Sequence, residues 1–200
     1  MSRRNIPQLG FTLVELMITI SVSAIVASGM YVFFNTSFNQ YLALQSNSSQ
    51  FTDLAAQSQR LANVLRGLTD IITPGSNDLT VYAYFAPNNT YVSVIRYYLV
   101  NNGKTLMADV TPMSADPPIG SPITAKKRTF TIIGGFSNAP GVNLFNYLDS
   151  SGAIIPMPLV DQHIVKGIQI NLSVPTSSGG PNGNQAMSLN VSLRNRKTNL

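Results

Sequence analysis

Near its amino terminus the chain has a long apolar segment that contains a single charged side chain. Residues 11–34 are mostly apolar, and Glu15 is the one charge among them and the one glutamate in the 200 residues. Residues 16–34 carry no charge, and about 20 predominantly apolar residues suffice for a helix to cross the ~30 Å hydrocarbon core of a bilayer. The pattern predicts a transmembrane helix over residues 11–34, in which the Glu15 carboxylate needs a compensating partner.

The helical pattern continues beyond this segment. No proline occurs between Pro7 and Pro74, and after a polar patch at residues 45–50 one face recurs every three or four residues. That face comprises Phe51, Leu54, Ser58, Leu61, Leu65 and Leu68. The spacing predicts a helix with one face toward a core. We expect one helix from about Thr12 to Arg66, ended by Gly67; two helices with a break at residues 46–49, where weak helix formers gather, are the alternative.

Residues 69–200 show the alternating pattern of β-strands, separated by turns rich in Gly, Asn and Pro. Asn101, Asn102 and Gly103 lie between two such runs and predict a hairpin turn. Residues 111–122 hold four prolines and predict a loop. One long helix followed by antiparallel strands predicts an α+β fold, in which the helix packs on an antiparallel β-sheet head. The expected strands cover residues 79–85, 91–100, 105–110, 128–133, 144–148, 153–155, 165–174 and 186–194.

The residues around Glu15 form a recognisable motif. Residues 10–16 are G-F-T-L-V-E-L, and a short leader with Arg3 and Arg4 precedes them. The motif resembles the processing site of type IV pilins and type II secretion pseudopilins. This resemblance implies that a prepilin peptidase cuts the bond between Gly10 and Phe11, that Phe11 becomes the N-methylated first residue, and that Glu15 is the fifth-position glutamate of the family.

Cleavage after Gly10 would also supply the missing counterion. It creates an ammonium on Phe11, four residues before Glu15 and therefore on the same face of a helix. A staggered neighbouring subunit could place its own ammonium against Glu15, which makes the buried carboxylate tolerable. A contact of this kind, repeated without closure, gives an open helical filament. The expected partners are thus other pilin or pseudopilin subunits, with membrane lipid around the segment before assembly.

Two simpler interpretations of the segment stay open. It could be a secretory signal peptide, with Arg3 and Arg4 as the basic region and a cleavage site at residues 27–29. The uncharged run of residues 16–34 is longer than the usual 7–15 residue core of such a peptide. It could also be a plain single-pass anchor with an incidental Glu15. In either anchored version, Arg3 and Arg4 predict that the rest of the chain lies outside the cytoplasm.

Three later segments resemble minor pilins of the PilW kind and J-type pseudopilins. They are V-I-R-Y-Y-L-V-N-N-G at residues 94–103, F-N-Y-L-D-S-S-G at residues 145–152 and V-S-L-R-N-R at residues 191–196. Without the resemblance, these are hairpin turns or a last strand, in which Asp149 and Asn195 cap turns. The chain has no cysteine, whereas many pilins carry a C-terminal disulfide loop, and this difference favours a minor pilin.

Candidate catalytic chemistry is sparse. His163 is the only histidine, and Asp161 is expected on the same side of a strand. A hydrolase that uses His163 is the alternative function, although no G-x-S-x-G motif presents a serine. Gly103, Lys104 and Thr105 resemble the end of a phosphate loop but are expected to form a turn. No metal-ligand spacing occurs, so we expect no metal, no cofactor and no enzymatic activity.

A basic cluster at residues 125–128, Ala-Lys-Lys-Arg, precedes an expected strand. Three charges are a small footprint for phosphate binding, so contact with nucleic acid is the weaker interpretation and a solvated strand end the stronger one.

These observations predict a structural subunit, most similar to a minor pilin, of a type IV pilus or pseudopilus. The expected organisation is a leader at residues 1–10, a transmembrane helix at 11–34, its amphipathic continuation at 35–68 and a β-rich head at 69–200. The expected location is the inner or cytoplasmic membrane, and then a cell-surface pilus or periplasmic pseudopilus. A single-pass, membrane-anchored extracytoplasmic binding protein or hydrolase is the alternative.

Overall fold

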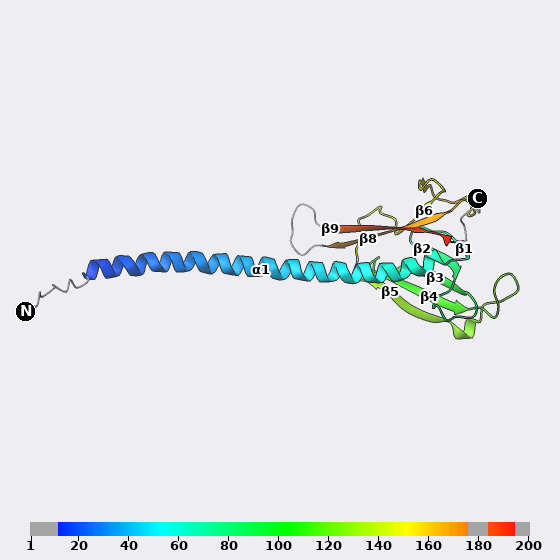
Figure 1. Ribbon diagram of the computed structural model, residues 1–200, viewed down its shortest axis with the longest axis horizontal. Helices are drawn as coiled ribbons and strands as arrows, with labels where there is room; N and C mark the ends of the chain where they lie inside the picture. Colours follow the sequence, from blue (N-terminus) through cyan, green and yellow to red (C-terminus); the bar gives the residue numbers. More distant parts are fainter. Residues whose placement is uncertain (1–11, 176–183, 195–200) are drawn as a thin grey trace, which may run out of the picture. The chain divides into compact units, whose positions relative to one another are not determined.

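The computed structural model describes residues 12–175 and 184–194 (Figure 1). Two of the predicted site residues, Gly10 and Phe11, lie outside the described residues. The chain divides into two compact units, Met1–Ser46 and Asn47–Leu200. The first unit holds the amino-terminal part of the long helix, and the second holds the rest of that helix and all the strands.

Helix α1 runs from Leu13 to Arg66 without a break, so the prediction of one helix is confirmed over the two-helix alternative. It ends where predicted, because Gly67 N donates to the Val64 carbonyl and Leu68 N to the Leu65 carbonyl, each at 3.2 Å. These bonds span three residues and tighten the last turn, as is common at helix ends. The part of α1 in the second unit presents the predicted face, from Leu54 onward, to the core of that unit.

The first sheet is an antiparallel meander of five strands in the order β1-β2-β3-β4-β5. Its third connection is the predicted hairpin, in which Asn101 and Asn102 both have φ of 54° and Gly103 has φ of 79°. Left-handed backbone of this kind suits Asn and Gly. A loop and the short 3₁₀ helix η1 (Thr124–Lys126) connect the last two strands. The strands are β1 (Asp70–Thr73), β2 (Asp78–Ala83), β3 (Ser93–Val100), β4 (Thr105–Pro112) and β5 (Arg128–Gly134).

The second sheet has four antiparallel strands in the order β7-β6-β8-β9. The sequence predicted one antiparallel sheet in the head; the structure has two. β5 ends at Gly134, and the left-handed φ of the next residue, Gly135, 77°, lets the chain leave the first sheet there. The strands are β6 (Phe145–Leu148), β7 (Ile154–Ile155), β8 (Gly167–Pro175) and β9 (Asn184–Ser192).

One hydrophobic core is shared by the last part of α1 and both sheets. The helix contributes the predicted face, of which Leu54, Ser58, Leu61, Leu65 and the following Leu68 are buried. It also contacts both sheets at their edges, because Gln57 Oε1 accepts from Gly134 N at 3.2 Å and Ser58 Oγ lies 4.0 Å from Met187 Sδ. The α+β prediction of a long helix packed on antiparallel sheets is confirmed.

The two sheets are joined through the turn between β1 and β2. The Tyr147 hydroxyl accepts a hydrogen bond from Gly75 N at 3.0 Å and donates one to the Gly75 carbonyl at 2.9 Å. Beside it, Phe145 N donates to the Ser76 carbonyl at 2.9 Å. Burial raises the pKa of Tyr147 above its ordinary value, so this hydroxyl stays protonated and can donate.

Candidate functional site

The described part of the amino-terminal motif begins with a reciprocal cap at the start of α1. Glu15 Oε2 accepts hydrogen bonds from Thr12 N and Thr12 Oγ1, each at 3.0 Å, and Glu15 N donates to Thr12 Oγ1 at 3.3 Å. This arrangement is a capping box, in which the side chains of the N-cap and the third helical residue satisfy each other's backbone amides. The predicted site residue Glu15 is therefore brought together with Thr12.

Sequence reasoning missed Thr12 as the partner of Glu15. The T-x-x-E spacing just before an apolar run is the pattern of a capping box and could have identified it. The cap has a further consequence for the carboxylate. Both contacts use Oε2, and within the described residues Oε1 accepts no hydrogen bond, so half of the carboxylate can accept from a group outside the chain.

The helix surface that follows is apolar on every side and uncovered. From Leu13, which is 73% exposed, to Leu44, which is 68% exposed, each large hydrophobic side chain of α1 is exposed to solvent. Residues 16–52 carry no charge. A helix that is apolar all round belongs in lipid or among other helices rather than in water. By length and composition, α1 is able to cross a membrane.

Three hydroxyl groups in this segment are compatible with a lipid environment. Thr19 Oγ1 donates to the Glu15 carbonyl at 2.7 Å, Ser21 Oγ to the Met17 carbonyl at 2.9 Å, and Ser28 Oγ to the Ala24 carbonyl at 2.7 Å. Each hydroxyl is satisfied by the preceding turn of its own helix. A polar group hydrogen-bonded within its segment avoids most of the cost of entering hydrocarbon.

The prediction that Asp161 and His163 lie on the same side of a strand is wrong. His163 and Asp161 lie in a turn before β8, not on one side of a strand. Asp161 Oδ1 accepts from the backbone N–H of His163 at 2.8 Å, so the carboxylate holds the turn and does not orient the imidazole. Within residues 12–175 and 184–194, no group of three or more His, Asp or Glu side chains is placed to hold a metal ion.

Two other predicted features form turns, as expected. Asp149 Oδ1 accepts from Ser151 N at 2.7 Å and from Ala153 N at 3.0 Å, which confirms Asp149 as a turn cap; Asn195 lies outside the described residues. Lys104 N donates to the Asn101 carbonyl at 3.2 Å, so residues 103–105 belong to the hairpin and not to a phosphate loop.

The basic cluster at residues 125–128 lies at the entrance of β5, as predicted. Lys127 Nζ forms an ion pair with Asp109 Oδ2 at 2.8 Å. Asp109 also accepts a hydrogen bond from Thr129 Oγ1 at 2.6 Å. One of the three charges is therefore neutralised by the neighbouring strand, whereas Lys126 and Arg128 form no ion pair with another described residue.

Comparison with protein families identifies the amino-terminal segment. Residues 7–31 match the family model described as the prokaryotic N-terminal methylation motif. No curated protein matches the chain. Proteins with this motif are structural subunits, which a prepilin peptidase processes and which assemble with other pilin subunits. The match includes Gly10, Phe11, Thr12 and Glu15, and the uncovered apolar surface of α1 extends beyond it. At residues 7–31 the chain thus carries the amino-terminal signal of type IV pilins and pseudopilins, followed by a pilin-like α+β architecture.

Proposed function

We propose that this protein is a structural subunit, of the minor-pilin kind, in a type IV pilus or pseudopilus. The observation that carries the proposal is the uncovered, charge-free surface of α1 that follows Glu15. Its large hydrophobic side chains are exposed and are not covered by the described part of the chain. Exposed apolar surface of this extent marks contact with lipid or with other proteins. The membrane provides the lipid before assembly, and the filament provides the neighbouring proteins afterwards.

In this proposal the leader, residues 1–10, is removed by cleavage between Gly10 and Phe11, and Phe11 is N-methylated. Residues 11–34 then hold the subunit in the inner or cytoplasmic membrane, residues 35–68 continue the helix, and residues 69–200 form the head outside the cytoplasm. Assembly moves the subunit into a cell-surface pilus or a periplasmic pseudopilus. The absence of cysteine and the resemblance of three head segments to PilW-type and J-type proteins favour a minor role.

Glu15 has a role in both states of the subunit. Before assembly, Thr12 satisfies Oε2 and completes the first turn of α1. During assembly, the Phe11 ammonium of a neighbouring subunit approaches Oε1, which the cap leaves open. A charge-assisted hydrogen bond in a medium of low dielectric constant is roughly twice as strong as a neutral one. It would fix the axial register between subunits.

Cleavage is tested by replacing Gly10 with a bulkier residue, Gly10→Val. We expect the precursor to accumulate with lower gel mobility, because the peptidase site no longer accommodates the residue before the scissile bond. Mass spectrometry of the unsubstituted protein should find N-methylphenylalanine, from Phe11, as its first residue. Unchanged mobility of the variant, or a mature protein that begins at Met1 or Met30, would contradict the proposal and favour a plain membrane anchor or a secretory signal.

Assembly is tested by Glu15→Ala. We expect normal membrane insertion and cleavage but at least about tenfold less protein in sheared filaments, since an ammonium left unpaired in an apolar environment is costly. Ser23→Ala, on the same helix and without a change of charge, is the matched control and should assemble normally. Full incorporation of Glu15→Ala would refute the pairing role and leave the cleavage proposal standing.

A further inference from the structure

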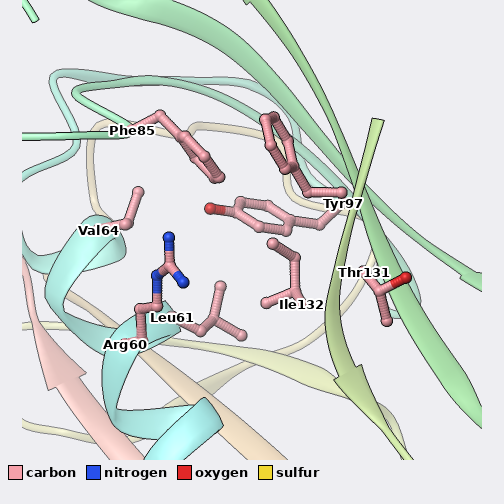
Figure 2. A pocket seen from close by; sticks show the side chains of 8 residues that line it. Arg60, Leu61, Val64, Phe85, Tyr97, Thr131 and Ile132 are labelled. Atoms are coloured by element: carbon pink, nitrogen blue, oxygen red, sulfur yellow. The ribbon is translucent and has the colours of Figure 1, made fainter. Parts of the chain in front are cut away.

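Two adjoining pockets of the head share one aromatic pair. The smaller, of about 60 Å³, lies between α1 and the first sheet, and Figure 2 shows Arg60, Phe85 and Tyr97 around it. The larger, of about 480 Å³, lies beside η1 and the start of β5. Phe85 and Phe130 line both pockets, and their rings stack with centroids 4.9 Å apart. We call the combined feature the basic cleft, after Arg60, Lys126, Lys127 and Arg128 in its walls.

The basic cleft has cations but no carboxylate among its lining residues. Lys127 is paired with Asp109, which lies outside the lining. Arg60, Lys126 and Arg128 are exposed, and none of them forms an ion pair with another described residue. Like charges gathered around an apolar floor raise the local concentration of anions and select against cations. The cleft therefore favours a ligand with negative charges and some apolar surface.

β5, which supplies Arg128 and Phe130 to the lining of the cleft, is an edge strand. β5 has β4 as its neighbour on one side, and no described strand pairs with its other side. Gln57 Oε1 accepts from Gly134 N at the end of β5; from outside the sheet no other hydrogen bond between described residues reaches the backbone of this strand. Most of β5 is exposed or half-buried, and Figure 1 shows it as the last strand of its sheet. Unpaired backbone groups of this kind form a template for another strand.

We propose that the basic cleft binds an extended acidic segment of a partner protein, which adds to the free edge of β5. Backbone hydrogen bonds to β5 would supply affinity, as in other cases of strand addition. Acidic side chains of the segment would meet Lys126, Arg128 and Arg60, and an apolar side chain would cover the Phe85–Phe130 pair. The inference concerns the second unit, Asn47–Leu200, and does not depend on the assembly of the first part of α1.

The partner is a different polypeptide and not a second copy of this chain. The chain has a formal net charge of +5 and only eight acidic residues, and each described strand that contains an acid contains just one. Nucleic acid fits the cleft less well. Phe85 and Phe130 stack on each other rather than presenting free faces to bases, and three unpaired cations are few for a phosphate backbone. Only a peptide can form the backbone hydrogen bonds that the open edge of β5 offers.

The test uses the full chain in detergent micelles and a fluorescent peptide of alternating Glu and Val with the length of β5, seven residues. Fluorescence anisotropy should show saturable binding. The double variant Lys126→Gln/Arg128→Gln should weaken binding roughly tenfold, because it removes two exposed charge contacts. The matched control Lys104→Gln/Arg66→Gln removes one lysine and one arginine outside the cleft and should bind as the unsubstituted chain does. Circular dichroism melts should show that all variants are folded.

Strand addition is separated from simple charge attraction by N-methylation of the peptide at alternate residues. Because the amides of a strand point alternately to its two sides, one of the two methylation patterns should abolish binding and the other should not. Three results would overturn the proposal. They are equal binding of the two methylated peptides, binding of a Lys-Val peptide as tight as that of the Glu-Val peptide, and unchanged affinity of the Lys126→Gln/Arg128→Gln variant for the Glu-Val peptide. Binding of a single-stranded oligothymidine in preference to the acidic peptide would overturn it in favour of nucleic acid.

Discussion

Both parts of α1 carry apolar side chains, but the surroundings of these side chains are opposite. Before Ser46, the large hydrophobic side chains are exposed on all sides of the helix, whereas after Asn47 the face formed by Leu54, Leu61 and Leu65 is at most 2% exposed. The second part is amphipathic and finds its partner in the strands of its own chain. The first part has no polar face, so one sheet could never cover it.

This difference shows that hydrophobicity alone does not say where a helix is buried. An apolar stripe is satisfied by a single neighbour, whereas a helix that is apolar all round needs a surrounding solvent of lipid or several other helices. The first part of α1 is therefore built for contacts with other molecules, and the second for folding of the head. Substitutions in the two parts should consequently affect different measurements.

The largest expected effect tests this separation directly. Leu61→Ala removes a core side chain that is 1% exposed and should lower the free energy of unfolding of the head by about 2–5 kcal/mol, because a cavity remains. Leu44→Ala makes the same chemical change at a position that is 68% exposed. It should leave unfolding of the head unchanged within about 0.5 kcal/mol. Denaturant unfolding of both variants in detergent, followed by circular dichroism, measures the two effects.

A reversed result would break the comparison. If Leu44→Ala destabilised the head as much as Leu61→Ala, the first part of α1 would be packed against its own chain and not reserved for lipid or other subunits. Filament yield supplies the second readout. Under the proposed function, Leu44→Ala should reduce the yield of assembled subunits while leaving the unfolding free energy of the head unchanged.

A second prediction concerns the junction of the two sheets. Tyr147→Phe keeps the ring in the core but removes the hydroxyl that bonds both backbone groups of Gly75. Leaving that amide and carbonyl with no partner should cost about 1–3 kcal/mol of stability. Tyr91→Phe, at an exposed position, is the matched control and should change the unfolding free energy very little. An unchanged midpoint for Tyr147→Phe would mean that this hydroxyl does not contribute to holding the two sheets together.

Much of this fold was predictable because its determinants are local. The spacing of Leu54, Leu61 and Leu65 fixed the buried face of α1, and Gly67 marked its end. The hairpin between β3 and β4 followed from Asn101–Gly103, since few residues accept left-handed backbone. Glu15 was identified because a lone carboxylate in an apolar run is costly wherever the chain folds.

What was missed depends on contacts between distant residues. The division of the strands into two sheets rests on pairings such as Phe145 with Ile170, and alternation does not say which strands pair. Strand β1 is short and has one buried residue, Ile71, so its pattern is too brief to detect. A turn forms at His163 in place of the expected strand, because the Asp161 side chain accepts a hydrogen bond from the backbone there. Side-chain hydrogen bonds of this kind compete with strand formation, and an alternating pattern does not show which of the two prevails.

The smallest expected effect contrasts the carboxylates of the two regions. Glu15 is satisfied in part by Thr12, whereas Asp109, 12% exposed, is satisfied by its own sheet. Burial alone would raise the pKa of Asp109, but hydrogen bonds from Lys127 and Thr129 outweigh it and hold that pKa below its ordinary value. A depressed carboxyl pKa contributes stability above the unfolded-state pKa, near 3.8, and this contribution is lost as the pH falls through the folded-state pKa.

Asp109→Asn should therefore lower the free energy of unfolding by about 1 kcal/mol at neutral pH, as expected for a partly exposed charge network. Below about pH 4 the difference in unfolding free energy between this variant and the unsubstituted protein should become smaller. Urea unfolding at a series of pH values measures both. Asp53→Asn, at an exposed position of α1, is the control and should give nearly the same pH dependence as the unsubstituted chain. A constant difference between the Asp109 variant and the unsubstituted protein across the acid range would show that this carboxylate contributes by shape and packing. The charge of Asp109 would then make no contribution to folding, just as the apolar surface of the first part of α1 is expected to make none.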